Sequence, residues 1–178
     1  VMQPTAIKRL QDILQGDGTK ITRDTIGPYL DHLHESYLTF GISSFTDSVS
    51  QRESVKKRYF YDNGILNLFL FLPETKLLEN LVAIKLYNKY GDDLYYYNKN
   101  VEVDFCVPND GLLIQASYRM IDEATRNREI GALQKLSKFI KPQRCIIVTY
   151  DQEEIVQSND LDVQIEVIPA YKFMLMAL

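Results

Sequence analysis

Three strand-like segments follow one another between residues 94 and 118 with almost no chain between them. They are Leu94 to Asn98, Val101 to Val107 and Leu112 to Tyr118, and short polar turns join them. A parallel pair of strands needs a crossover connection of about a dozen residues or more. Turns this short therefore allow only antiparallel hairpins, and the chain must contain an antiparallel meander of three strands.

Further elements are predicted on both sides of this meander. Leu77 to Tyr90 repeats apolar side chains at helical spacing, and the continuous apolar run Cys145 to Thr149 is typical of a strand buried on both faces and paired in parallel. The remaining elements are a helix over Asp122 to Phe139, a strand over Val163 to Ile168 and a short helix over Ala170 to Leu178. The predicted order is αβββαββα, an α/β (α+β) fold with a central mixed sheet.

The first sixty residues show a different pattern, with two helices followed by a hairpin. Thr5 to Gln15 is amphipathic at helical spacing, and Thr22 is a suitable N-cap for a second helix that ends near Glu35. Tyr37 to Phe45 and Arg58 to Tyr61 then have the composition of two strands. This order predicts a winged helix-turn-helix.

We therefore predict two domains, a winged-helix-like domain over residues 1–62 and a second domain over residues 63–178. A length of 178 residues and a composition that is 46% hydrophobic allow one domain or two small ones. The stretch Tyr59 to Leu72 is too apolar for a flexible linker, so we expect the boundary to be packed.

The sequence favours the cytoplasm and no membrane span. The longest apolar run, Gly64 to Leu72, is interrupted by Asn67 and is well short of the roughly 20 residues that cross a bilayer. No secretory signal pattern precedes it, and Cys106 and Cys145 fit no metal-binding spacing, as expected of buried thiols in a reducing compartment.

Charge is distributed unevenly along the chain. Residues 1–58 carry 8 Lys and Arg against 7 Asp and Glu, whereas the remainder carries 12 against 17. Strong nucleic-acid binders present a clustered positive face, which the acidic second part lacks. A local basic patch remains, which we interpret either as a solvated loop or as a DNA contact. Its residues are Arg52, Lys56, Lys57 and Arg58.

The predicted second helix favours protein docking over DNA binding. Its exposed face carries Asp24, Asp31 and Glu35 against Arg23, which repels a phosphate backbone. His32 and His34 are the only histidines, and their spacing of two residues points them to different sides of this helix. Metal pairs and catalytic units that need histidine therefore have little support.

Polar residues occupy the middle and last strands of the meander. By simple alternation Glu102, Asp104 and Cys106 share one face, and Val101, Val103, Phe105 and Val107 share the other. On the next strand, Gln115 and Ser117 share a face. A plausible register places Asp104 across from Gln115 and Ser117, so polar side chains are expected to meet near the sheet centre.

This arrangement resembles the PD-(D/E)XK, or restriction-endonuclease-like, nuclease superfamily. In detail the chain is similar to the C-terminal part of a family of prokaryotic AAA-type P-loop ATPases, in which a winged helix and a nuclease-like domain of unassigned function follow the ATPase module. The stretches that carry the resemblance are KRYFYDNGILNLFL at 57–70, ENLVAIKLY at 79–87, LYYYNKNVEVDF at 94–105 and GLLIQASY at 111–118.

The resemblance implies a degenerate nuclease site. Asp104 matches the first motif acid and Glu79 matches a helix acid that assists metal binding, but Gln115 stands where the second acid would be and Ser117 where the lysine would be. Such acids hold a divalent cation, and the lysine supports the attacking water. Losing one such group commonly costs roughly 10²–10³-fold in rate.

Several interpretations of these residues stay open. Glu79, Asp104, Gln115 and Ser117 could form a structural hydrogen-bond network. Alternatively, Glu79, Asp104 and Gln115 could keep a weak Mg²⁺ or Mn²⁺ site, or a lysine elsewhere, Lys99 or Lys85, could restore an active nuclease.

Our leading hypothesis is a non-catalytic accessory module of a larger ATPase, serving protein docking or the engagement of a nucleic acid or other substrate. A divergent metal-dependent nuclease and a DNA-binding winged helix are the alternatives. No GxxxxGK[ST] phosphate loop occurs in the chain, so ATP binding is expected only in an upstream module of the same polypeptide. The expected partners are that module and either a protein or DNA.

Overall fold

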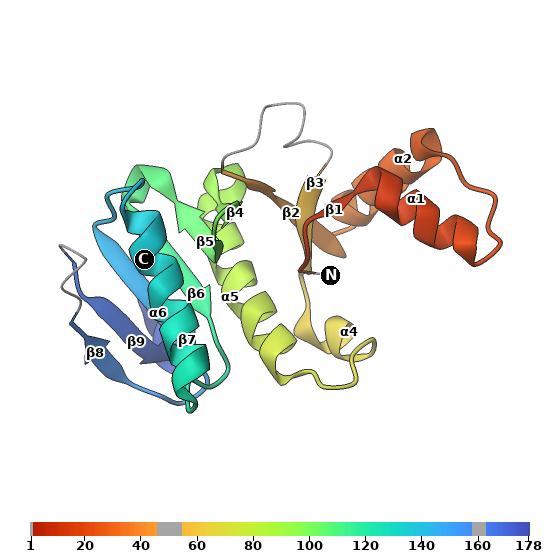
Figure 1. The fold of residues 1–178 in the computed structure, drawn as a ribbon. Coiled ribbons are helices and arrows are strands. Elements are labelled where there is room, and N and C mark those ends of the chain that lie inside the picture. The colour runs from red at the N-terminus through yellow and green to blue at the C-terminus, as the bar shows by residue number, and fades with distance from the viewer. Residues whose placement is uncertain (1, 46–54, 158–162) are drawn as a thin grey trace.

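The computed structural model describes residues 2–45, 55–157 and 163–178. Within these ranges the strands form one sheet of nine strands in the order β1-β3-β2-β4-β5-β6-β7-β9-β8, with helices packed on it (Figure 1). The predicted mixed α/β class with a large mixed sheet is confirmed. None of the helices in the described ranges is both long and apolar enough to cross a membrane.

The helices and strands lie close to the predicted positions. In chain order they are β1 (Thr5–Ala6), α1 (Ile7–Gly16), α2 (Arg23–Glu35), β2 (Thr39–Ser44), β3 (Val55–Phe60), α4 (Asn63–Asn67), α5 (Glu74–Tyr90), β4 (Tyr95–Asn98), β5 (Glu102–Val107), β6 (Leu112–Ala116), α6 (Glu123–Ser137), β7 (Arg144–Thr149), β8 (Glu154–Val156), β9 (Ile165–Pro169) and α7 (Ala170–Leu175). The sequence pattern misses β1, α4 and β8, because elements of two to five residues are too short to show a period.

Strand directions follow from the connections. β4 and β6 both pair antiparallel with β5, as the short turns require. β7 pairs parallel with β6 and with β9, as its uninterrupted apolar sequence predicts. The edge strand β8 returns antiparallel beside β9, so the predicted order gains one strand after β7.

The N-terminal hairpin belongs to the same sheet as the meander. β2 pairs with β3 and also, in parallel, with β4, where Ser43 lies opposite Tyr95. Phe40 and Tyr59 of the hairpin are buried in one apolar cluster with Leu78 and Val82 of α5. Both the sheet and this cluster therefore cross residue 62, and the division into 1–62 and 63–178 stays a prediction.

Each face of the sheet carries its own apolar cluster. One cluster combines α5 and α7 with residues such as Phe105, Ile114 and Ile146. The other combines Leu133 and Leu136 of α6 with strand residues of the opposite face, including Cys106 and Cys145. The meander is thus the middle layer between α5 and α6, and both cysteines are free and buried, as predicted.

A bulge in β5 changes which side chains share a face. The register between β4 and β5 shifts opposite Asp104. Val103 consequently packs with Cys106 on the α6 side, whereas Phe105 and Val107 pack on the α5 side. The predicted alternation, with Val103, Phe105 and Val107 on one face, is therefore wrong, because the bulge adds a residue to one strand. This bulge places Asp104 where its carboxylate can meet residues of α5 and the hairpin.

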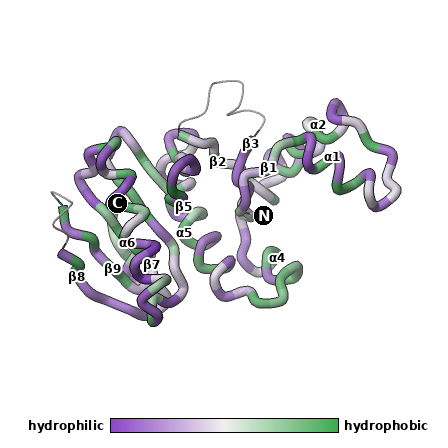
Figure 2. Tube along the Cα trace, viewed as in Figure 1, coloured by the Kyte–Doolittle hydropathy of each residue, from purple (hydrophilic) through white to green (hydrophobic). Residues whose placement is uncertain are grey.

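The predicted packed boundary is correct for Tyr59, Phe60, Tyr61 and Leu66, but the segment after α4 is largely exposed. Leu66 is buried, but Leu68, Phe69, Phe71 and Leu72 have exposed fractions of 80%, 69%, 103% and 84%. The green stretch at α4 in Figure 2 contains this segment. Residues 63–73 contain no charged side chain, so this is an uncharged apolar surface in water, and we name residues 68–72 the apolar segment.

Candidate functional site

Lys57 lies at the centre of the site, although the sequence predicted this residue in an exposed basic patch. Lys57 Nζ is 2.8 Å from a carboxylate oxygen of Glu102, 3.4 Å from one of Asp104 and 3.8 Å from one of Glu79. Its side chain is only 1% exposed. The prediction of a solvated loop or DNA contact is wrong for Lys57, because β3 begins at Val55 and directs this side chain into the protein.

The two matched acids, Glu79 and Asp104, do come together as predicted. Glu79 is buried on α5 and accepts a hydrogen bond of 3.0 Å from the Tyr59 hydroxyl. The second carboxylate oxygen of Asp104 accepts a hydrogen bond of 3.0 Å from the Ala116 amide. Neighbouring strands and α5 therefore hold both carboxylates in place around the Lys57 ammonium.

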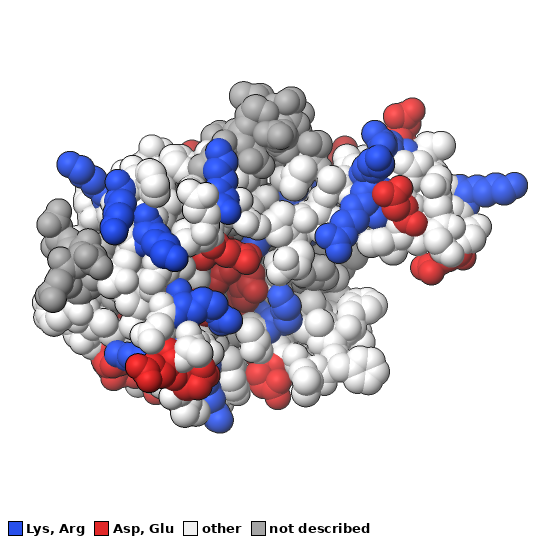
Figure 3. Space-filling model, in the orientation of Figure 1, with Lys and Arg blue, Asp and Glu red and all other residues white. Residues whose placement is uncertain are grey.

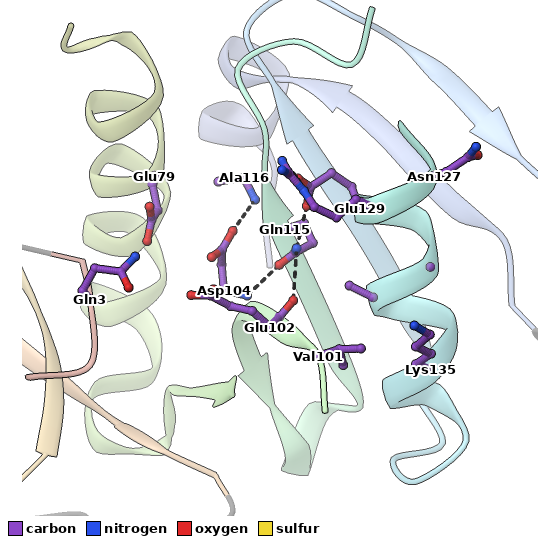
Figure 4. A pocket seen from close by; sticks show the side chains of 13 residues that line it. Gln3, Glu79, Val101, Glu102, Asp104, Gln115, Ala116, Asn127, Glu129 and Lys135 are labelled. Atoms are coloured by element: carbon purple, nitrogen blue, oxygen red, sulfur yellow. Dashed lines mark hydrogen bonds and ion pairs between the residues drawn. The ribbon is translucent and has the colours of Figure 1, made fainter. Parts of the chain in front are cut away.

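Gln115 forms a separate network with the other side of β5. Its amide oxygen accepts a hydrogen bond of 2.6 Å from the Asp104 backbone N–H, and its amide nitrogen donates at 2.6 Å to Glu129 (Figure 4). The amide nitrogen is also 3.4 Å from the Glu102 carbonyl oxygen. Gln115 thus binds the backbone beside Asp104, and its contacts do not include the Asp104 carboxylate.

Ser117 lies close in the chain but makes no contact with the carboxylates in the described residues. It is buried, and its hydroxyl donates to the Arg119 carbonyl oxygen at 3.5 Å. The predicted contact between Asp104 and Gln115 is therefore made through the Asp104 backbone amide and not through its carboxylate. The predicted contact between Asp104 and Ser117 is wrong.

Lys57, Glu102 and Glu129 are the site residues that the sequence reasoning missed. Glu129 is buried on α6 at helical spacing from Leu133 and Leu136, so a carboxylate within an apolar stripe was an available signal. Glu102 had been placed on the face of Asp104 without a role. No comparable signal marks Lys57, since its burial depends on how the hairpin joins the sheet.

Burial changes the pKa of Glu79, Glu129 and Lys57 in this site. Burial, followed by repulsion from Asp104, raises the pKa of Glu79 to about 7, although Lys57 opposes this shift. For Lys57, burial alone would lower the pKa, but attraction to Asp104, Glu79 and Glu102 outweighs it and the pKa is raised. Burial also raises the pKa of Glu129, despite the Arg128 ion pair. Two buried acids and the lysine of this site therefore have perturbed pKa values.

The site opens into a cavity of about 420 Å³ between α5, the meander and α6. Glu79, Glu102 and Asp104 line it together with Gln115 and Glu129, and Arg128 and Lys135 of α6 also border it. Figure 3 shows acidic side chains gathered near the middle of the molecule with lysine and arginine side chains around them. Lys57 is not among the lining residues, because it lies beneath them.

The two lysines considered as replacements have other positions. Lys85 Nζ donates to the backbone carbonyl oxygens of Phe173, Met174 and Met176 at 2.6, 2.9 and 2.6 Å, so it holds the C-terminal end of α7 against α5. Lys99 is exposed in the turn after β4. Among the described residues, Lys57 is the lysine that lies within 4 Å of Asp104.

The predicted basic patch does not form as one surface. Arg52 lies outside the described residues. Lys57 is buried, Lys56 lines a different cavity of about 300 Å³, and Arg58 donates at 3.3 Å to the Thr5 carbonyl oxygen. Burial lowers the pKa of Arg58, with nearby Asp31 opposing this shift. Neighbouring lysines on a strand point to opposite sides, which is why Lys56 and Lys57 separate.

The predicted weak metal site has suitable oxygen donors in a different arrangement. In ranges 2–45, 55–157 and 163–178, no group of three His, Cys, Asp or Glu side chains is placed so as to hold a metal ion. Glu79 and Asp104 offer the carboxylate oxygens that Mg²⁺ and Mn²⁺ prefer, but both face the Lys57 ammonium, and Gln115 faces Glu129.

Sequence comparisons give two likenesses. A family model described as a domain of unknown function (DUF8612) matches residues 3–76, which run from the β1 region into α5. The Uncharacterized protein MJ1544 of Methanocaldococcus jannaschii is 33% identical over 181 residues, which cover 96% of this chain and 40% of that protein. No solved structure matches. The chain is thus similar, over nearly its whole length, to one region of a longer archaeal protein.

Proposed function

We propose that this chain is an accessory module of a longer ATPase-type protein, with a nuclease-like centre that does not cut nucleic acid. The observation that carries this proposal is the network of Gln115, which uses its amide on the Asp104 backbone and on Glu129. A nuclease of the resembling superfamily would need an acid there, and a lysine at the position of Ser117. Ser117 instead donates to a backbone carbonyl.

The order of the elements supports the nuclease-like part of this proposal. α5, the antiparallel meander, α6 and the parallel strand β7 follow one another in the order that the resemblance implies. Asp104 lies on the middle strand of the meander and Glu79 on the helix before it. The other part of the proposal, that an ATPase module lies elsewhere in the same protein, rests on the resemblance alone.

Nucleic-acid cleavage is the first test of this proposal. With Mg²⁺ or Mn²⁺ in millimolar concentration, the wild-type chain is expected to cut single- or double-stranded DNA and RNA no faster than its D104A variant, because two of the groups that support the reaction are replaced. Labelled substrates on a denaturing gel measure this. Metal-dependent cleavage by the wild type that disappears in D104A would refute the proposal.

A divergent metal-dependent nuclease is the second candidate, and one distance favours it. Lys57 Nζ is 3.4 Å from Asp104, so β3 supplies an ammonium close to the matched acid. In that case both K57A and D104A would abolish a Mn²⁺-dependent cleavage. A DNA-binding role for the winged-helix-like part receives less support, because Lys57 is buried and α2 carries acidic side chains.

We propose that the apolar segment docks on the rest of the longer protein. Four of its five large apolar side chains are exposed, and no charged group within residues 63–73 would have to be desolvated. The chain spans only 40% of the length of the archaeal relative, so such a protein contains a large further region. We propose that this further region is the surface that covers the apolar segment.

A split version of the archaeal relative tests this docking. The region aligned with this chain and the remaining region, produced separately, are expected to co-elute. Glutamates at the positions aligned with Phe69 and Phe71 should weaken the association by about 30-fold or more, as for central apolar anchors. A glutamate aligned with exposed Tyr171 is the control. Failure to associate, or self-association of the aligned region through the same positions, would contradict the proposal.

A further inference from the structure

The Lys57 ammonium reaches the site from a different part of the chain than the carboxylates. Lys57 lies on β3 of the N-terminal hairpin, whereas Glu79 lies on α5 and Glu102 and Asp104 lie on β5. Three carboxylate oxygens surround its Nζ at 2.8 to 3.8 Å. Burying a lysine to 1% exposure is costly unless such partners compensate its charge.

We infer that Glu79, Glu102 and Asp104 form a cation site whose resident is the Lys57 ammonium of the same chain, so that hairpin β2–β3 closes this site to divalent cations. The inference rests on the proposed function, since it explains how a nuclease-like centre keeps its acids without a metal ion. It names the ligand that the wild-type site holds and the class of ligand, a divalent cation such as Mn²⁺, that the lysine excludes.

The hairpin fixes Lys57 at this position in several ways. Phe40 lies opposite Tyr59 in the β2–β3 register, and their rings stack with centroids 5.6 Å apart. Tyr59 lies on the same side of β3 as Lys57, and its hydroxyl binds Glu79. A register slip of one residue would exchange Lys57 for Lys56, so the stacked pair and the hydroxyl keep the ammonium in the site.

The carboxylates have suitable chemistry to hold a divalent cation once the ammonium is removed. Divalent cations bind oxygen at about 2.0–2.6 Å. The oxygens of Glu102, Asp104 and Glu79 lie 2.8, 3.4 and 3.8 Å from the ammonium nitrogen, so Glu102 has the least distance to move and Glu79 the most. Glu102 can make this movement easily, because its side chain is 45% exposed. Glu79 and Asp104 are already held by the Tyr59 hydroxyl and the Ala116 amide.

Thermal unfolding with MnCl₂ tests the inference on the whole chain. The K57A variant is expected to melt about 5–10 °C higher at a Mn²⁺ concentration near one hundred times its Kd than without Mn²⁺. The wild type and K56A, the neighbouring lysine on the opposite side of β3, should shift by less than about 1 °C at the same concentration. In the double variant K57A/D104N the Mn²⁺ shift should disappear.

Three outcomes would overturn the inference, and none of them depends on nuclease activity. One is an equal Mn²⁺ shift in the wild type and K57A. Another is a folded K57A that Mn²⁺ does not stabilise, and K57A/E102Q, with one carboxylate charge fewer around the vacated position, serves if K57A does not fold. The third is Mn²⁺ held by the wild type in electron paramagnetic resonance and released in D104N. Metal-dependent cleavage of DNA or RNA by the wild type would refute the proposed function, and it is a separate measurement from the Mn²⁺ binding tests.

Discussion

Lys57→Met is expected to lower the free energy of unfolding by about 3–5 kcal/mol at pH 8, the cost of leaving buried charges without their partner. Methionine keeps the apolar stem but removes the ammonium that three carboxylates share. Glu79 is buried and Asp104 has a side chain only 15% exposed, so water compensates little of the loss. Urea unfolding followed by circular dichroism measures the change.

Lys56→Met is the matched control for this measurement. Lys56 is the preceding residue on β3, is partly buried, and lines cavities away from the three carboxylates. Its replacement should cost less than about 1 kcal/mol. Equal losses in the two variants would mean that any change on β3 destabilises the hairpin, and that Lys57 has no special electrostatic role.

The stability of the wild type is expected to fall between pH 5 and pH 8 because of Glu79. Its pKa is raised to about 7 in the folded protein, first by burial and then by Asp104, and exceeds the ordinary glutamate value near 4.5. The stabilising contribution of its proton is therefore complete below the unfolded pKa and is lost as pH rises through about 7. The loss is on the order of 3 kcal/mol.

Glu79→Gln should remove most of this pH dependence. Glutamine is neutral at every pH in the window and can still accept the hydrogen bond from the Tyr59 hydroxyl. Urea unfolding at pH 5, 6, 7 and 8 would show a nearly flat profile for this variant. E74Q, an exposed glutamate in the first turn of the same helix, should keep the slope of the wild type. A slope unchanged by E79Q would contradict the assignment.

Much of the fold follows from local sequence patterns. Short turns require the antiparallel meander, and the apolar run Cys145 to Thr149 indicates the parallel strand β7. The pairing of Glu79 with Asp104 came from the resemblance to the nuclease superfamily and not from these local patterns. The mixed sheet and its helices were therefore predictable from spacing and alternation.

The arrangement within the site was not predictable in this way. The prediction of the side of the sheet on which Val103 lies assumed regular alternation, and the bulge in β5 breaks this alternation. No residue in the strand indicates that a bulge is present. The burial of Lys57 depends on β2 pairing with β4, a contact between segments about fifty residues apart, whereas a local reading of basic residues suggests a solvated loop. Tertiary contacts outweigh local composition at both places.

For the apolar segment, the sequence predicts more burial than the structure shows. Its composition predicts burial, yet Phe71 and Leu72 are exposed in this chain. Exposed apolar patches of this kind often mark interaction sites. The docking proposed above would explain why a stretch with a core-like composition lies at the surface.

Anomalous diffraction from wild-type crystals grown in MnCl₂ tests the central claim most directly. The account predicts that Lys57 Nζ keeps its place among Glu79, Glu102 and Asp104 and that no manganese peak appears within 3 Å of their carboxylate oxygens. A manganese ion bound between Glu79 and Asp104, with the Lys57 ammonium displaced from them, would contradict it.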